Sequence, residues 1–580
     1  MFSFYLNARP FFERFRFFYF LIILIVASLN VRAQTVTVST SDTVSASVTA
    51  DFYGIQYHAN TFTDAQALNR LALLHLVPVR IWAKLNDFHP QPNVWQWADL
   101  DQKVDEVIAA GYQPMVCLYQ SEQWFTGSAD NPWWNDSTAI SEWQNAAYQL
   151  ALRYHDRVHR YIIFDEINMM HPEDGYYISF ARSAQLYCQA AKEIKRADPA
   201  LLCGGPSSFG GWENGYWAKY VLNQPDGNEL LDFISANLFL SWNADDPDSL
   251  IMNRTIWYEE AAQKIESMVG TQTSARLVLD AYNVSALWQK NGQLWTDPRN
   301  TNFFASIYQV AALLHALKGG FSVTLHWETI GGYGVLDWYP QFNPLPPYYA
   351  WRFLIEVIGL SQGSKLIQCH TDETPKSGIQ HHGGMQVNAY EVQPFALQPN
   401  DTTVNVVLIR KYRGAERLVK VIPPEHLPFY RLFRLDSTHV QTCFTPFARG
   451  RADSLLLVRC PQRSVTVIQF SARQVVGLGF QKARFQIPSN LTVTRAFPNP
   501  FNASVRIEFK LGRAEYVTGE LFDAAGQKIT TLFRKKLSKG GHYFIWKGKN
   551  AQGCAVASGV YYVCLYTGNT MAARKIIYLK

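Results

Sequence analysis

The stretch Tyr161-Ile-Ile-Phe-Asp-Glu-Ile-Asn168 decides the fold class of this chain. Its apolar start has the length and character of a short buried strand, and it ends in two adjacent carboxylates. An earlier run, Val77 to Trp82, is similar because it carries Arg80 in an otherwise apolar strand. Apolar strands seldom carry charges without partners, because burying an unpaired charge costs several kcal/mol in order of magnitude. The two segments therefore indicate strands whose carboxyl ends meet at a polar site.

Outward from these segments, short apolar runs alternate with longer segments of helical period. We predict eight strands, at residues 53–57, 77–82, 114–119, 161–166, 201–205, 233–239, 277–281 and 322–327. Helical stretches lie between them, including residues 100–110 and 303–318, and the last helix is expected at residues 348–358. Eight β-α units favour a (β/α)8 TIM barrel. The alternative is a doubly wound open sheet, which would normally have a glycine-rich phosphate loop after its first strand.

The helical period disappears after Gly363, where half-buried strands follow one another. We assign residues 34–362 to the barrel and residues 363–485 to an accessory β-sandwich. Residues 490–580 contain about seven short strands separated by turn signals, which predicts a small C-terminal Ig-like β-sandwich. The predicted fold class is therefore α/β, with a TIM barrel followed by two β-sandwiches.

The first 33 residues have the pattern of a secretory signal peptide. Arg9, Arg14 and Arg16 precede an apolar run at residues 17–29, and Val31-Arg-Ala33 supplies small residues at a cleavage site. An uncleaved membrane anchor would need about 20 apolar residues, and this run is shorter. We expect cleavage after Ala33 and no membrane span in the mature chain.

Composition limits the classes of partner and cofactor. Of the 580 residues, 48% are hydrophobic and 17% charged, which argues against a mainly disordered chain. Lys and Arg (53) exceed Asp and Glu (47) without a long basic block, so nucleic acid is not an expected partner. The eight Cys include no Cys-x-x-Cys pair and no cluster with His at metal spacing. No metal and no cofactor is implied.

Polar residues at the predicted strand ends are the candidates for a functional site, since a TIM barrel carries its site there. They are His58, Arg80, Gln120, Glu166, Asn237, Asp280, Trp327 and Glu328. Arg80 and Glu166 could simply form an ion pair that closes the barrel top. A carboxylate held beside an Arg and several aromatic residues also suits acid/base chemistry. Tryptophans in the loops after strands 3, 6 and 7 either contact sugar or pack within the loops. They are Trp124, Trp133, Trp134, Trp242, Trp288 and Trp295.

The C-terminal stretch has a second, more specific pattern. Phe497-Pro-Asn-Pro-Phe-Asn502 opens it, Ala555-Val-Ala-Ser-Gly-Val-Tyr561 forms a later turn, and a basic strand ends it. This arrangement resembles the C-terminal sorting domain of type IX secretion cargo in Bacteroidetes-like bacteria. The resemblance implies the type IX secretion machinery as a partner. It also implies that the chain is secreted or held at the cell surface, via the periplasm.

Phe164-Asp-Glu-Ile-Asn168 resembles the Trp-Asn-Glu-Pro-Asn motif of clan A glycoside hydrolases. In that clan the acid/base Glu follows strand 4 of a (β/α)8 barrel and the nucleophile Glu follows strand 7. The likeness extends over about residues 50–470 and is nearest to the β-xylosidase/α-iduronidase and arabinofuranosidase families. It implies a glycoside hydrolase acting on an oligo- or polysaccharide, with Glu166 as general acid/base.

The chain departs from the clan's pattern at three positions. Asp165 stands where the clan has the Asn that binds the sugar 2-hydroxyl, and Asn237 stands where related members have a His. Strand 7 reads Leu279-Asp-Ala-Tyr-Asn283, so Ala281 occupies the place of the nucleophile. We assign substrate binding to His58, Arg80, Asp165, Asn237, Tyr282 and Trp327, and catalysis to Glu166, Asp280 and Glu328. Tyr282 would orient a carboxylate, and Trp327 would form a floor under a sugar ring.

A methyl group cannot form a glycosyl-enzyme bond, so three interpretations stay open at this point. In the first, a one-residue bulge turns Asp280 inward as a displaced nucleophile or base. In the second, Glu328 or Asp165 acts as a base toward water, and the enzyme inverts the anomeric centre. In the third, the barrel is a non-catalytic carbohydrate-binding protein at the cell surface, derived from a glycosidase.

Overall fold

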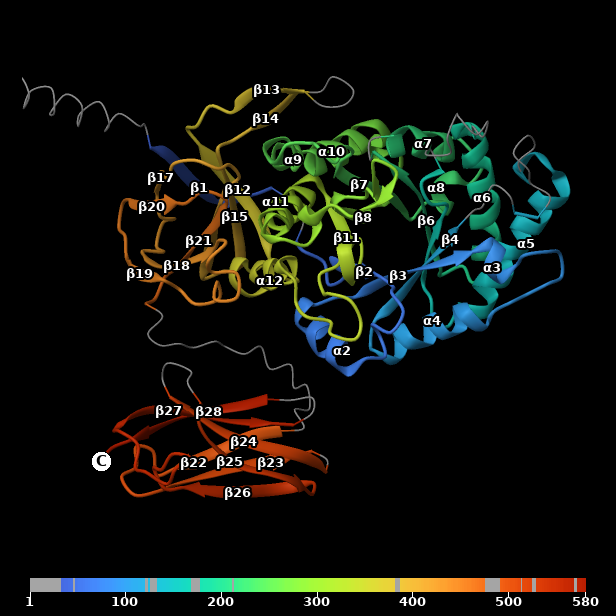
Figure 1. The fold of residues 1–580 in the computed structure, drawn as a ribbon. Coiled ribbons are helices and arrows are strands. Elements are labelled where there is room, and N and C mark those ends of the chain that lie inside the picture. Colours follow the sequence, from blue (N-terminus) through green and yellow to red (C-terminus); the bar gives the residue numbers. More distant parts are fainter. Residues whose placement is uncertain are drawn as a thin grey trace, which may run out of the picture. The chain divides into compact units, whose positions relative to one another are not determined.

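The protein is described by a computed structural model. It covers residues 33–44, 47–119, 124–125, 133–167, 178–210, 213–380, 386–474, 491–512, 514–523, 528–567 and 571–580. The chain divides into two compact units, Met1–Val475 and Val476–Lys580 (Figure 1). Most of the predicted signal segment, Gln120 and Asn168 lie outside the described residues. Within the described part of the chain, no helix is both long and apolar enough to cross a membrane.

The first unit contains the predicted closed barrel of eight parallel strands, in the order β11-β2-β3-β4-β5-β6-β7-β8. The strands are β2 Tyr53–Gln56, β3 Pro78–Lys84, β4 Gln113–Tyr119, β5 Arg160–Ile163, β6 Leu202–Phe209, β7 Phe233–Ser241, β8 Arg276–Ser285 and β11 Phe321–His326. Each agrees with a predicted strand to within a few residues, and the parallel pairing confirms the TIM-barrel prediction.

Helices surround the barrel (Figure 1). They are α2 Ala65–Leu71, α3 Leu85–Phe88, α4 Ala98–Ala109, α5 Ser137–Tyr154, α6 Phe180–Ala197, α7 Glu213–Leu222, α8 Gly227–Leu230, α9 Asp248–Arg254, α10 Trp257–Val269, α11 Phe303–Gly319 and α12 Pro346–Phe353. Shorter turns are η1 Ala72–Leu74, η2 Trp133–Asn135, η5 Gly270–Gln272, η6 Pro298–Asn300, η7 Gly331–Tyr333 and the π-helical η8 Leu354–Ile358. Helix α11 is buried along almost its whole length because it contacts both the barrel strands and the sheet behind them.

Strand alternation decides which side chains enter the barrel. On β3, Val79, Ile81 and Ala83 belong to the large core beneath the helices, so Arg80 and Trp82 point inward. The lower interior is apolar. It contains Met115, Cys117, Ile162, Phe233, Val278, Val323 and Leu325. Polar side chains are therefore confined to the carboxyl end of the barrel, where β-strand residues are followed by loops.

Behind the barrel lies a nine-stranded sheet of order β19-β18-β21-β16-β15-β12-β1-β17-β20. Its strands are β1 Gln34–Thr43, β12 Lys365–Thr371, β15 Val392–Asn400, β16 Thr403–Arg410, β17 Arg417–Val421, β18 Phe429–Leu435, β19 Ala448–Arg451, β20 Leu456–Cys460 and β21 Ser464–Ser471. Small hairpins are β9 Gln289–Lys290 with β10 Gln293–Leu294, and β13 Lys376–Gln380 with β14 Gln386–Ala389.

The predicted start of the barrel domain, at residue 34, is wrong. Strand β1 lies within the segment that we assigned to the barrel, but it pairs with β12 and β17 of the nine-stranded sheet. The physical reason is burial, since Val36 packs in the core of that sheet together with Ile367 and Val419. Strand β1 thus belongs to the accessory sheet, and the first strand of the barrel in the sequence is β2.

The second unit has its own core and seven described strands, as predicted. Strands β22 Leu491–Phe497, β23 Val505–Leu511 and β26 Gly540–Trp546 form one sheet. Strands β25 Lys528–Leu537, β24 Glu515–Asp523, β27 Gly559–Tyr566 and β28 Met571–Tyr578 form the other. Side chains of both sheets meet in one core, which confirms the small C-terminal β-sandwich.

Candidate active site

Arg80 is fully buried at the top of the barrel and lies between two carboxylates. Its Nη2 is 2.6 Å from Asp165 Oδ1, and its Nη1 is 3.5 Å from Asp280 Oδ2. The predicted Arg80–Glu166 ion pair is therefore replaced by pairs with Asp165 and Asp280. One cation beside two acids, with a third acid adjacent, leaves the cluster with an excess of negative charge, which favours protonation of one carboxyl.

Glu166 is joined to this cluster through an amide. Asn237, from β7, donates from Nδ2 to Glu166 Oε1 at 2.9 Å and to Asp165 Oδ1 at 3.3 Å. Trp82 donates from Nε1 to Asp165 Oδ2 at 3.2 Å. The side chain of Asp165 is thus used to hold Arg80, Trp82 and Asn237. Glu166 receives one hydrogen bond from these residues, and its side chain is partly buried, as is that of Asp165.

Asp280 reaches the same cluster because it points into the barrel, as Val278 does two residues earlier, while Leu279 between them faces the helices. Leu279 pairs with Ala236, whereas Ala281, two residues later, pairs with the adjacent Asn237. Asp280 is the extra residue and points inward, where it accepts a short hydrogen bond from Ser207 Oγ. Gln56 Nε2 donates to the Asp280 carbonyl at 2.7 Å. A register shift as in the first of our three interpretations is present, and Asp280 does point inward to Arg80, but alternation with Val278 already gives it that direction.

The same shift carries Tyr282 away from the carboxylates. Its ring is fully buried on the helix side of β8, edge-on to Tyr258 and His326. The structure therefore does not bring Tyr282 together with Glu166. A bulge adds one residue to the strand, so the side chain after the bulge points to the opposite face from the one that simple alternation predicts.

Three non-glycine residues around the cluster have left-handed backbone conformations. Phe164 has φ 75°, Glu166 has φ 48° and Ser207 has φ 55°. Such conformations are uncommon for residues with a Cβ, and cost of order 1 to 3 kcal/mol each. Their concentration where β5 and β6 end places the carboxyl of Glu166 and the hydroxyl of Ser207 next to the Arg80 cluster.

Burial changes the protonation of the two inward acids. It raises the pKa of Glu166 to about 7, and the neighbouring Asp165 carboxylate adds to this shift. Burial likewise raises the pKa of Asp280 to about 6, although Arg80 counteracts the effect. A carboxyl with a pKa near neutrality can both give and take a proton, which is the property of an acid/base group.

Glu328 and Trp327 lie at the end of β11, on the mouth of the barrel. The Trp327 ring packs edge-on against Trp82 at 5.0 Å and Phe239 at 6.4 Å, and it is partly exposed. Burial raises the pKa of Glu328, while His58 lowers it. Among the described residues, Glu328 makes no side-chain hydrogen bond to the Arg80 cluster. It forms a second acidic position, beside His58 and separate from the Glu166 network.

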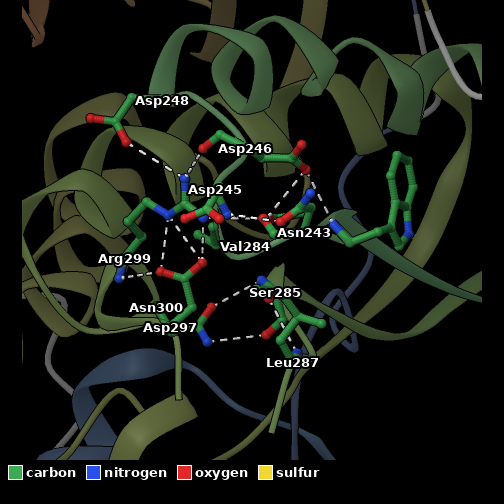
Figure 2. Close-up of polar contacts among 12 residues, drawn as sticks. Asn243, Asp245, Asp246, Asp248, Val284, Ser285, Leu287, Asp297, Arg299 and Asn300 are labelled. Carbon is green, nitrogen blue, oxygen red and sulfur yellow. Dashed lines mark hydrogen bonds and ion pairs between the residues drawn. The ribbon is translucent and has the colours of Figure 1, made fainter. Parts of the chain in front are cut away.

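The loops after β7 and β8 are fastened to each other at the rim (Figure 2). Arg299 donates from Nη1 to the Asp246 carbonyl at 2.5 Å, and its Nη2 lies 2.5 Å from Asp297 Oδ2. Asn300 Oδ1 accepts from the Ser285 backbone at 3.0 Å, and its Nδ2 donates to the Ser285 carbonyl at 3.0 Å. These contacts hold the loop that follows Asp280 in a fixed position.

The loop tryptophans fall into two groups. Trp124, Trp133 and Trp134 are buried and pack against one another, so they fill the core and do not offer rings to a ligand. Trp242 and Trp295 are partly buried. Trp288 is 60% exposed. The tryptophans that remain candidates for sugar contact are therefore those of the loops after β7 and β8, namely Trp242, Trp288 and Trp295.

Several site residues were not predicted. Ser207 and Gln56 bind Asp280, Trp82 binds Asp165, and the 59% exposed Trp338 packs edge-on against His58. Trp82 could have been found, since it follows Arg80 by two residues on the same strand and so faces the same way. Trp338 carries no such signal, because it lies in a loop.

Within the described residues, no group of three or more His, Cys, Asp and Glu is placed to hold a metal ion. The carboxylates of the cluster instead use Arg80, Trp82, Asn237 and Ser207 as partners.

The comparisons with known proteins gave a sequence-family match in the second unit and matches to solved structures over most of the chain. The sequence-family profile for the FlgD Ig-like domain matches residues 500–570. No curated protein matches the sequence at a significant level. Among solved structures, the chain is similar to CelM2, a bifunctional glucanase-xylanase from a metagenome library, with 14% identity and a TM-score of 0.54 over 76% of this chain and 99% of CelM2.

Two further structures have comparable similarity. The α-L-arabinofuranosidase from Thermotoga maritima has 13% identity and a TM-score of 0.55, over 76% of this chain and 100% of that enzyme. A monomeric β-xylosidase from Caulobacter crescentus has 16% identity and a TM-score of 0.51, over 76% of this chain and 99% of that enzyme. At such identities the likeness concerns the fold. The chain thus has a glycosidase-like barrel with an accessory sheet, and a C-terminal Ig-like domain.

Proposed function

We propose that the barrel hydrolyses O-glycosidic bonds, with Glu166 and Asp280 as its two carboxyl groups. Protonated Glu166 gives its proton to the glycosidic oxygen as the bond from that oxygen to the anomeric carbon breaks, and the leaving group departs as an alcohol. Asp280 either attacks the anomeric carbon or takes a proton from the water that attacks it. Carboxyl separations of about 5 to 5.5 Å and about 6.5 to 9.5 Å characterise these two routes.

One observation carries the proposal. Asp280 points from β8 into the cluster that Arg80 and Asn237 connect to Glu166, and so supplies a second carboxyl where Ala281 provides none. One oxygen of Asp280, Oδ1, accepts no hydrogen bond from any described residue although the side chain is fully buried. An unsatisfied buried acceptor is costly, and a water or substrate hydroxyl would satisfy it.

The test is the turnover of the wild-type protein on aryl xylosides, aryl arabinofuranosides, xylan and arabinan across pH 4 to 9. Since Glu166 must be protonated to act as an acid, and burial raises its pKa to about 7, the rate should be highest below pH 7 and fall as pH rises through 7. Hydrolysis that stays constant to pH 9 would contradict the role of Glu166.

The second candidate function is carbohydrate binding without catalysis, and the observation that favours it is Ala281 at the end of β8. Calorimetry on the same glycans distinguishes the two functions. Heat of binding without release of sugar would support the binding protein, whereas turnover by the wild-type chain excludes it.

We also propose that the chain is exported through its signal segment and the sorting-like C-terminal domain. The support is the sequence pattern at both ends. Because the second unit has its own core, deletion of residues 490–580 should leave the barrel folded but held in the periplasm. Fractionation of the native host checks this. Normal appearance of the shortened protein outside the cell would contradict it.

A further inference from the structure

The outward face of the four-stranded sheet in the C-terminal unit carries a groove that the barrel function does not use. On this sheet Val517, Leu521, Val563 and Leu565 face the core, so the alternate residues face outward. The groove has a volume of about 530 Å³. It is lined by Tyr516, Thr518, Arg534, Tyr566 and Thr567.

Strand register places the groove residues side by side. Thr518 on β24 pairs with Arg534 on β25 at one side and with Tyr566 on β27 at the other. Tyr516 lies two residues before Thr518 on the same face and is 66% exposed. Four of the five lining side chains are hydroxyl-bearing, and the fifth is a guanidinium. This composition fits a ligand that is both polyhydroxylated and anionic.

Arg534 is the charged side chain that lines the groove. Arg534 forms no ion pair with a carboxylate among the described residues. Glu520 faces outward on β24 but is bound by Lys528. Lys536 pairs with Tyr516 across the strands and extends the positive charge along β25. The guanidinium of Arg534 is therefore available for an external anion, and a carboxylate can accept two parallel hydrogen bonds from it.

The positive charge of the chain is concentrated in this unit. Residues 491–580 contain 14 Lys and Arg and only 4 Asp and Glu, whereas the rest of the chain contains 39 and 43. The excess of basic residues in the whole chain therefore comes from residues 491–580. A net charge of this size attracts polyanions over roughly 10 Å at moderate salt.

We propose that this groove binds an acidic polysaccharide, one whose sugar rings carry carboxylate groups. Arg534 pairs with a uronate carboxylate, the rings of Tyr516 and Tyr566 cover the C–H faces of sugar rings, and the hydroxyls of Thr518 and Thr567 hydrogen-bond to sugar hydroxyls. The site would hold the chain on a carboxylated glycan while the barrel acts elsewhere on the same material. It is independent of the catalytic pair and goes beyond the proposed hydrolysis.

The test is native affinity electrophoresis of the full chain in gels containing polygalacturonate, with dextran as the neutral reference. The wild-type chain should be retarded by polygalacturonate and not by dextran. Arg534→Gln should raise the apparent dissociation constant by about 10-fold or more. Arg534→Lys should retain more affinity than Arg534→Gln but less than the wild type, since Lys lacks the planar guanidinium. Tyr516→Ala combined with Tyr566→Ala should weaken retardation without changing net charge.

Lys510→Gln is the matched control, because Lys510 is exposed on β23 of the other sheet and its loss changes the charge equally. It should leave retardation close to that of the wild type. Equal losses in Lys510→Gln and Arg534→Gln would overturn the site in favour of unspecific charge attraction. Absence of retardation, or equally tight binding to duplex DNA, would also overturn it. Glu166→Gln should be retarded like the wild type, so failure of the barrel chemistry and failure of the groove remain distinguishable.

Discussion

Glu166→Gln is expected to lower the turnover of glycosides with poor leaving groups by about 100-fold or more. Gln keeps the size of the side chain and can still accept the hydrogen bond from Asn237 Nδ2. It has no proton to give to the leaving oxygen at any pH. The loss of rate therefore measures proton donation by Glu166. In Glu166→Gln the rate should no longer decline as pH rises through 7.

The dependence on the leaving group separates this result from simple damage. Nitrophenolate is a good leaving group and departs without proton assistance. The turnover of nitrophenyl glycosides by Glu166→Gln should therefore fall much less than that of alkyl glycosides. Glu193→Gln makes the same chemical change on the outer helix α6, where Glu193 pairs with Arg196, and it should retain wild-type rates. Equal activity of wild type and Glu166→Gln on alkyl glycosides would remove Glu166 from the mechanism.

Asp280→Asn should reduce turnover on all substrates by about 1,000-fold, because it removes the negative charge that β8 contributes to the cluster beside Arg80. Asn is close to Asp in shape, and Arg80 keeps Asp165 as a partner at 2.6 Å. The variant should therefore fold, which a thermal melting curve checks. Asp280 also contributes to raising the pKa of Glu166, so the decline of any residual rate should move to lower pH. Wild-type turnover in Asp280→Asn would exclude Asp280.

Regular strand alternation made most of the fold predictable. Apolar runs of strand length separated by helical segments give eight β-α units, and inward placement of Arg80 follows from its outward neighbours Val79 and Ile81. Asp165 and Glu166 could be located because they directly follow an apolar strand. These features depend on local periodicity, which a single sequence contains.

Other parts of the site depend on contacts between distant segments. The shift in β8 arises from pairing with β7 and β11, so the inward position of Asp280 could be proposed from sequence but not chosen over Ala281. Tyr282 was misplaced for the same reason. Trp133 looked like a cleft residue because it lies in a polar stretch, but tertiary packing against Trp124 and Trp143 buries it.

Chemical rescue of Asp280→Ala by sodium azide tests most directly whether Asp280 is the second carboxyl. Azide is small enough for the space that the Asp280 side chain leaves. It would attack the anomeric carbon in place of the missing carboxylate or of the water that this carboxylate activates. We expect azide to restore nitrophenyl glycoside turnover in Asp280→Ala and to give a glycosyl azide of inverted anomeric configuration, because azide attacks from the face opposite the leaving group. Full activity of Asp280→Ala without azide, together with azide-dependent activity of Glu328→Ala, would contradict this account and assign the role to Glu328.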